Sequence, residues 1–175
     1  MNAGRIVRGA WLSLLVLSAA CGQQEASQQE DNTMKASTTY LYLLRKTPFF
    51  DRLNTAQLRW TIDHSREWEA QAGTVVANCS SADKGDDFWI LLDGRWQVEH
   101  DGHTYPAGHA DAGKWFSASE TSGSCQLVTT GHSYVMKITR ADMNDMLGRG
   151  FAFESHLQQG HAYYRTMFAV ASASH

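Results

Sequence analysis

The stretch "FWILLDGRWQVEHDGHTYPAG", residues Phe88–Gly108, contains three short apolar runs separated by turn signals. The dipeptides Asp93-Gly94 and Asp101-Gly102 are of the type that tight β-hairpin turns select, because their residues tolerate a positive φ. The stretch therefore predicts three consecutive antiparallel strands, and it fixes how the second and third strands pair.

The turn at Asp101-Gly102 sets the register of this predicted pair. If these two residues form the turn, His100 and His103 face each other across the strands, with Cβ atoms ~5 Å apart. The next pairs on the same face are Val98 with Tyr105 and Trp96 with Ala107. We expect this apolar face to point inward and the opposite face, with Glu99 and Thr104, to meet water.

The same alternation of short apolar runs and turn residues extends from Gly73 to Ile138. Many short strands at this spacing are typical of a sandwich or barrel that closes its edges. The sequence therefore predicts a mainly β fold of the double-stranded β-helix or jelly-roll type, flanked by N- and C-terminal helices.

Helical patterns lie on both sides of the β region. The first runs from Thr38 until Pro48 stops it. The second is expected over residues 54–73, with Asn54 as N-cap, Gln57 completing a capping box and Gly73 at its end. A last helical segment follows residue 139, and Gly160 interrupts its apolar face, which carries Phe153, Leu157, Tyr164 and Phe168.

The N-terminal residues predict export. Arg5 and Arg8 precede an apolar run, Ala10–Ala20, which has the length of a signal-peptide core and is too short to span a bilayer. The run ends in "VLSAAC", which resembles a bacterial lipobox and predicts a lipid on Cys21. The alternative is plain secretion after cleavage near Ala20.

The predicted organisation has three parts. Residues 1–20 form a lipoprotein signal peptide, residues 21–37 a lipid-anchored flexible linker, and residues 38–175 the folded domain. The linker is rich in Gln, Glu and Ser and lacks aromatic residues, so it cannot bury enough apolar surface to order itself.

Two cysteines, Cys79 and Cys125, remain in the predicted domain. An oxidising periplasm allows them to pair, and the loop they would close is worth about 4 kcal/mol on the chain-entropy model. The alternative is two separate buried thiols. Neither belongs to a Cys-x-x-Cys motif, so thiol redox catalysis is unsupported.

The order of these segments resembles the cyclic-nucleotide-binding domain, the β-roll of the catabolite activator protein type. The resemblance is carried by "PFFDRLNTAQLRWTI" (48–62), "FWILLDGRWQVEHDG" (88–102), "AGKWF" (112–116) and "YVMKITRADMNDML" (134–147). It implies the fold, and it implies a ligand pocket near Gly113, Lys114 and Trp115.

The departure from that family lies in its phosphate-binding cassette. Gly113 stands at the glycine of the family's Gly-Glu pair, but Lys114 replaces the acid that would hold a ribose hydroxyl. No arginine occurs between Gly113 and Thr130, so the bidentate contact to a cyclic phosphate is missing. We therefore expect no useful binding of cyclic AMP or cyclic GMP.

A second hypothesis is a metal- or haem-binding protein, or a cupin-like metal-dependent enzyme, that uses His100, His103 and His109. "YPAGH" (105–109) resembles part of a cupin motif, and His109–Asp111 forms a His-x-Asp pair of the kind that non-haem iron enzymes use. The first cupin motif is absent. The favoured hypothesis is accordingly a non-enzymatic binding module without a cofactor. Only the second hypothesis requires a bound divalent transition metal or haem.

Charge limits the partners. The chain carries 15 Lys+Arg against 18 Asp+Glu, a formal net charge of −3, and has no basic run. Nucleic acid is therefore an unsupported partner. We expect a membrane contact through the lipid, an unidentified small ligand or periplasmic protein as partner, and a place on the periplasmic side of the bacterial envelope, at the outer rather than the inner membrane.

Overall fold

The computed structural model describes residues 40–79 and 85–172, all of which belong to one compact unit. Residues 40–46 are helical. The elements that follow are η1 (Pro48–Phe50), α2 (Thr55–Asp63), β1 (Arg66–Ala70), β2 (Val75–Asn78), β3 (Phe88–Asp93), β4 (Arg95–His100), β5 (His103–Gly108), β6 (Trp115–Phe116), η2 (Ala118–Glu120), β7 (Cys125–Thr129), β8 (Ser133–Ile138), α3 (Arg140–Gly148) and α4 (Glu154–Ser172). In this part of the chain, no helix is both long and apolar enough to cross a membrane.

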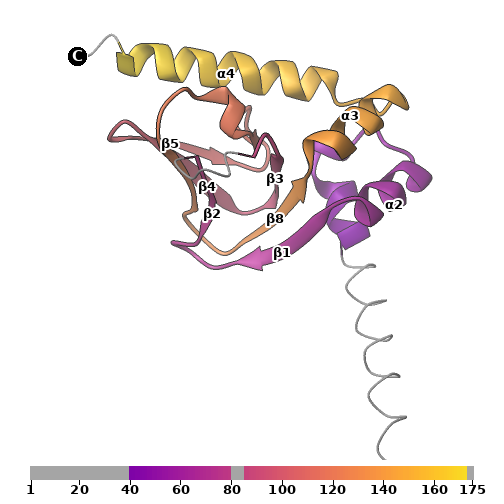
Figure 1. The fold of residues 1–175 in the computed structure, drawn as a ribbon. Helices are drawn as coiled ribbons and strands as arrows, with labels where there is room; N and C mark the ends of the chain where they lie inside the picture. Colours follow the sequence, from indigo (N-terminus) through magenta and orange to yellow (C-terminus); the bar gives the residue numbers. More distant parts are fainter. Residues whose placement is uncertain (1–39, 80–84, 173–175) are drawn as a thin grey trace, which may run out of the picture. The chain divides into compact units, whose positions relative to one another are not determined.

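The strands form two antiparallel four-stranded sheets. One has the order β1-β8-β3-β6 and the other β2-β7-β4-β5. Figure 1 shows β8 between β1 and β3 in the first of these sheets. The predicted mainly β fold with flanking helices is confirmed, as two paired sheets that form a roll. Each apolar run predicted as a strand between residues 74 and 138 contains one, although the run at residues 114–118 is a strand only at Trp115–Phe116 and enters η2 at Ala118.

The β4–β5 hairpin has the register that its turn predicts. Asp101 and Gly102 both have positive φ, 49° and 76°, as a type I′ turn requires. His100 lies opposite His103, and the inward face is buried as expected. The further pairs on this face are Val98–Tyr105 and Trp96–Ala107.

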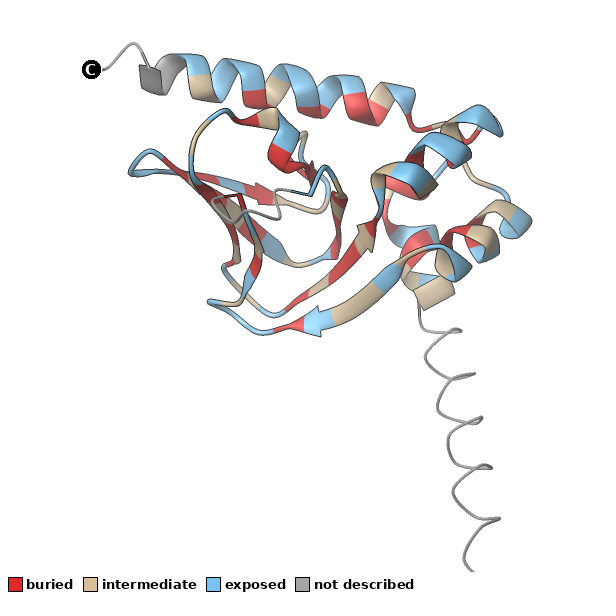
Figure 2. Ribbon diagram, in the orientation of Figure 1, coloured by how far each residue is buried: buried red, intermediate tan, exposed pale blue. Residues whose placement is uncertain are grey.

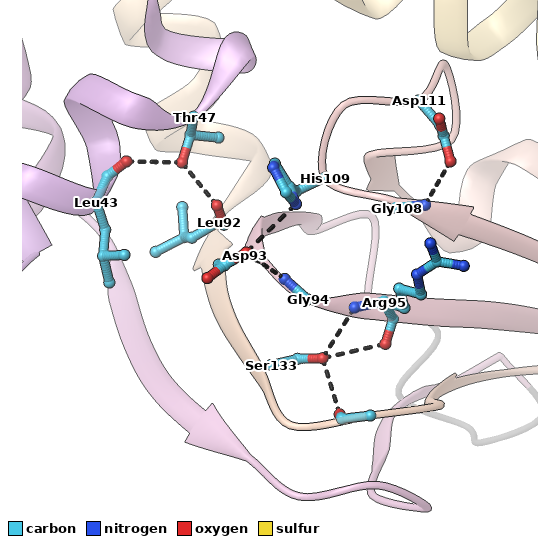
Figure 3. Close-up of polar contacts among 11 residues, drawn as sticks. Leu43, Thr47, Leu92, Asp93, Gly94, Arg95, Gly108, His109, Asp111 and Ser133 are labelled. Atoms are coloured by element: carbon cyan, nitrogen blue, oxygen red, sulfur yellow. Dashed lines mark hydrogen bonds and ion pairs between the residues drawn. The ribbon is translucent and has the colours of Figure 1, made fainter.

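The turn between β3 and β4 depends on glycine. Gly94 has φ +95°, and a Cβ there would lie 2.4 Å from the Ser133 hydroxyl oxygen. The Gly94 N–H donates to the Asp93 carboxylate at 2.8 Å, and the Arg95 N–H donates to Ser133 Oγ at 3.2 Å (Figure 3). These contacts join the β3–β4 turn to the start of β8.

The helix predicted over residues 54–73 is wrong beyond its first half. The capping box of Asn54 and Gln57 is present, but α2 ends at Asp63 and residues 66–70 form strand β1. The Glu and Ala residues of this segment have helical propensity, yet pairing with β8 prevails. Trp68 lies against Trp89, with ring centroids 5.5 Å apart, which secures β1 to the sheet.

The core has two parts. The helical cluster lies between the helices and the first sheet, and the sheet cluster lies between the two sheets. The helical cluster includes Phe49, Phe50, Ile90, Trp115, Met136 and Phe153. The sheet cluster includes Leu91, Trp96, Val98, Phe116, Leu127, Val135 and Tyr164. Helix α4 runs along the roll with its buried residues turned toward the strands (Figure 2).

Cys79 and Cys125 form a disulfide, as the favoured sequence interpretation predicts. Their Cα atoms are 4.9 Å apart, and the Cys79 N–H donates to the Cys125 carbonyl at 2.9 Å. Both residues are buried. The bond therefore joins the end of β2 to the start of the neighbouring β7.

Candidate functional site

The segment Gly113–Trp115, where the sequence places a ligand pocket, is buried beneath α4. The Gly113 carbonyl accepts hydrogen bonds from Trp96 Nε1 at 2.9 Å and from the Tyr164 hydroxyl at 3.2 Å. A Cβ at Gly113 would lie 2.8 Å from the ring of Tyr163. Side chains of α4 and β4 therefore occupy the space around this glycine.

Trp115 is part of the core. Its side chain is fully buried, and its Nε1 donates to the His156 carbonyl at 2.9 Å. Gly160 lies directly over the indole, since a Cβ there would be 2.1 Å from Trp115 Nε1. This close approach explains why a glycine occurs in the middle of a 19-residue helix: it lets α4 lie flat against β6.

Lys114 is also buried, with 3% of its surface exposed. Its Nζ donates to the Asp111 carbonyl at 3.3 Å. Burial lowers the pKa of the Lys114 ammonium, and the carboxylates of Asp51 and Asp111 partly oppose that shift. The cation that replaces the family's acid is therefore held inside the protein, beside two carboxylates.

His156, near the start of α4, lies close to this lysine. Neither of its ring nitrogens has a hydrogen-bond partner among the described residues, although Nε2 lies 3.7 Å from Asp51 Oδ1. Burial lowers the pKa of the His156 imidazole, the charge of Lys114 lowers it further, and Asp51 opposes both. Lys114 and His156 are therefore two basic groups that lie together in a poorly solvated environment.

Aromatic side chains close the roll under α4. Tyr164 is fully buried, and its single hydroxyl proton is shared between the Trp115 carbonyl at 2.9 Å and the Gly113 carbonyl at 3.2 Å. Phe168 stacks on Tyr164 with centroids 5.6 Å apart and meets Tyr105 edge-on at 5.3 Å. Burial raises the pKa of the Tyr164 hydroxyl well above its usual value, so that it remains a hydrogen-bond donor.

The structure brings His100 and His103 together but leaves His109 apart. His100 is buried, with Nδ1 3.0 Å from the Ser124 carbonyl, whereas His103 is exposed. His109 lies at the opposite end of the hairpin, where its Nδ1 is 3.4 Å from Asp93 Oδ1 (Figure 3). Within residues 40–79 and 85–172, no three His, Cys, Asp or Glu side chains are placed to hold a metal ion.

An open recess of about 430 Å³ lies at the tip of the β4–β5 hairpin and the start of β7. It is lined by Glu99, His100, Asp101, Gly102, His103, Thr104, Ser124, Cys125 and Gln126. Most of these residues are polar, and the disulfide supports one wall. The sequence pointed to His100 and His103 of this lining, but the recess itself was not predictable, because it depends on the approach of β7 to the hairpin.

The way in which α4 closes the roll was also not predicted from the sequence. His156, Gly160 and Tyr164 are spaced four residues apart, so they share one face of the helix. A glycine between two large residues at that spacing is a signal for close packing.

Cys21, the predicted lipid attachment site, lies outside the described residues.

No protein-family model and no curated protein sequence matches this chain. Solved structures do match its fold. One, described as Sp-2Cl-cAMPS bound to PKAR CBD2, has a TM-score of 0.58 and 15% identity, and the match covers 79% of this chain and 93% of that chain. A CooA mutant from Carboxydothermus hydrogenoformans has a TM-score of 0.53 and 10% identity, over 72% of this chain and 83% of that one.

A third similar structure is the regulatory subunit of a cAMP-independent protein kinase A from Trypanosoma cruzi, bound to guanosine. Its TM-score is 0.54 at 17% identity, and the match covers 79% of this chain but only 52% of that subunit. Together with the order of the strands and flanking helices, these matches show that the chain has a cyclic-nucleotide-binding-domain-like fold.

Proposed function

We propose that this protein is a non-enzymatic binding or sensing module, held on the periplasmic side of the bacterial envelope by a lipid on Cys21, that does not bind cyclic AMP or cyclic GMP. The observation that carries the ligand part of the proposal is the position of α4 over Gly113–Trp115, whereas the "VLSAAC" sequence carries the anchor. The Gly113 carbonyl accepts a hydrogen bond from Trp96 Nε1 and lies 3.2 Å from the Tyr164 hydroxyl, and Lys114 is enclosed by protein.

The charges needed for a cyclic nucleotide are also missing from this segment. Replacement of the acid by Lys114 and the lack of an arginine up to Thr130 remove two charge-assisted contacts, each worth ~1.5–3 kcal/mol. That loss corresponds to a drop in affinity of roughly 10²–10⁴-fold. The fold nevertheless suits other ligands, since the similar subunit from Trypanosoma cruzi is described as cAMP-independent and bound to guanosine.

Calorimetry with cyclic AMP and cyclic GMP tests the ligand side of this proposal. We expect no binding tighter than about 0.1 mM, the value that a micromolar family affinity would reach after a hundredfold loss. A dissociation constant near 1 µM for either nucleotide would contradict the proposal. In that case α4 must move away from Gly113 to admit the ligand.

The membrane anchor is tested by fractionation of cells that produce Cys21→Ala. We expect this variant to move from the membrane fraction to the soluble fraction, or to remain uncleaved, because it lacks the thiol that would carry the lipid. The unchanged chain should sediment with membranes. Equal processing and solubility of the two proteins would show plain secretion instead.

A further inference from the structure

The charges of the described domain are distributed unevenly. Residues 40–66 carry five Arg or Lys against two Asp, a net +3, whereas the remaining described residues carry six against twelve, a net −6. All five cations of the first group are exposed. Residues 40–66 lie beside α3 at one end of the roll, away from the β4–β5 turn (Figure 1).

Three side chains of the helical residues 40–46 share one exposed face. Tyr42, Arg45 and Lys46 follow the i, i+3, i+4 spacing, and the Lys46 ammonium lies 5.7 Å from the centre of the Tyr42 ring. Tyr42 is 61% exposed, while Leu44 of the same helix is fully buried. The helix therefore has an outer face that is both basic and aromatic.

A hydrogen bond extends this face to α2. Arg45 Nη2 donates to Thr55 Oγ1 at 2.9 Å, and Arg59 lies one helical turn beyond Thr55. Within the described part of the chain, Arg45, Lys46 and Arg59 form no ion pair. Asp63 lies one further helical turn beyond Arg59. Tyr42, Arg45, Lys46 and Arg59 thus form one surface, called here the basic face.

We propose that the basic face lies against anionic phospholipid headgroups. The inference rests on the proposed membrane anchor, since Cys21 precedes Tyr40 by 19 residues. The part of the domain closest along the chain to that anchor is also its basic part. Arginine and lysine are attracted to anionic lipid, and an exposed tyrosine suits the interface between headgroups and acyl chains.

Vesicle co-sedimentation of the chain without residues 1–21 tests this surface separately from the lipid anchor. That chain keeps every described residue and the whole compact unit. We expect it to bind vesicles of phosphatidylglycerol and phosphatidylethanolamine at about 50 mM salt, to bind pure phosphatidylcholine vesicles far less, and to dissociate at about 300 mM salt as surface charges are screened.

Two double variants with equal charge changes locate the binding surface. The double variant Lys46→Gln with Arg59→Gln should lower the partition coefficient of the truncated chain onto anionic vesicles by about thirtyfold. Each cation near the membrane raises that coefficient about fivefold. Arg95→Gln with Arg165→Gln, at exposed positions outside residues 40–66, should change it by less than about threefold. Equal losses in the two doubles, or equal binding to both kinds of vesicle, would overturn the proposal.

The anchor and the basic face can fail independently. If Cys21→Ala fractionates like the unchanged chain while Lys46→Gln with Arg59→Gln still loses vesicle binding, the anchor is wrong and the basic face stands. If the anchor is confirmed but the truncated chain ignores anionic vesicles, the basic face is wrong. Binding to an acidic protein without binding to vesicles would likewise overturn the lipid assignment.

Discussion

Gly160 is the residue on which the docking of α4 depends most directly. A methyl group at this position would lie 2.1 Å from Trp115 Nε1 and 2.5 Å from Cε2, inside contact distance of a fully buried indole. Either the indole or the helix would have to shift. Because the Trp115 Nε1 hydrogen bond to the His156 carbonyl fixes the ring, the helix has little room to adjust.

Gly160→Ala should therefore lower the free energy of unfolding by about 1–3 kcal/mol, the usual cost of overpacking a core. Gly148→Ala is the matched control, because a methyl group on this glycine of α3 would meet no atom within 4 Å. That change should raise stability by about 0.4–1 kcal/mol. Urea denaturation measures both, and similar effects of the two changes would contradict the packing of Gly160 on Trp115.

His156 predicts how stability depends on pH. Its pKa is lowered by burial and by Lys114, with a smaller contribution from Arg52, while Asp51 opposes the shift. Between that lowered pKa and the ordinary value of 6.5, the unfolded chain binds more protons at this residue than the folded chain does. The free energy of unfolding is therefore unaffected by His156 titration above pH 6.5. It decreases as the pH falls below 6.5, because the unfolded chain takes up a proton at His156 before the folded chain does.

His156→Phe keeps an aromatic ring against Phe49, which His156 approaches with ring centroids 5.5 Å apart, and removes the group that titrates. We expect the variant to lose less stability than the unchanged chain between about pH 7 and pH 5, as measured by thermal unfolding. His64→Gln, at the exposed C-cap of α2, is the control. An identical pH dependence of His156→Phe and the unchanged chain would refute this role.

At the scale of the elements, the disulfide holds β2 to β7 at the edge of the second sheet. Its sequence separation of 46 residues makes its removal strongly destabilising in the chain-entropy model, by about 4 kcal/mol. Strand β2 is short and has β7 as its partner in the sheet. The covalent bond therefore contributes much of what keeps this edge strand in place.

Replacing Cys79 and Cys125 together by Ala should reduce the free energy of unfolding by up to about 4 kcal/mol. A reductant should destabilise the unchanged chain by a similar amount and leave the double variant unaffected. Titration of thiols in denatured protein recovered from the producing cells should find neither cysteine free. Two free thiols there, or no response to the reductant, would show that the bond does not form in the cell.

At the scale of the whole molecule, the two core clusters share their strands. In β3, Ile90 and Leu92 belong to the helical cluster and Leu91 to the sheet cluster. Strand β6 contributes Trp115 to the first cluster and Phe116 to the second. Opposite faces of the same strands thus support both clusters, so neither can lose its packing without disturbing the other.

We therefore expect one cooperative unfolding transition. The described tryptophans report on both parts, since Trp60 and Trp115 belong to or pack on the helical cluster, and Trp68, Trp89 and Trp96 on the sheet cluster. Tryptophan fluorescence and far-UV circular dichroism should give coincident urea transitions. Two separated midpoints would show that the helical part and the sheets unfold independently.

The sequence alone determined the local structure wherever the signal was local. The Asp101-Gly102 turn set the register of β4 and β5 because the turn type and the period-two alternation allow one pairing. The N-cap at Asn54 and the apolar face of α4 were predictable for the same reason. The resemblance to the cyclic-nucleotide-binding domain then followed from the order of these segments.

Features that depend on partners distant in sequence became visible only in the folded protein. Residues 66–70 form a strand despite their helical propensity, because they pair with β8 at the edge of the first sheet. Gly113 and Lys114 are buried because residues of α4, among them His156 and Tyr164, return over them from about 40 to 50 positions further along the chain, and Trp96 of β4 donates to the Gly113 carbonyl. Hydrophobic periodicity shows that a helix has a buried face, but which residues that face covers depends on how the elements pack together.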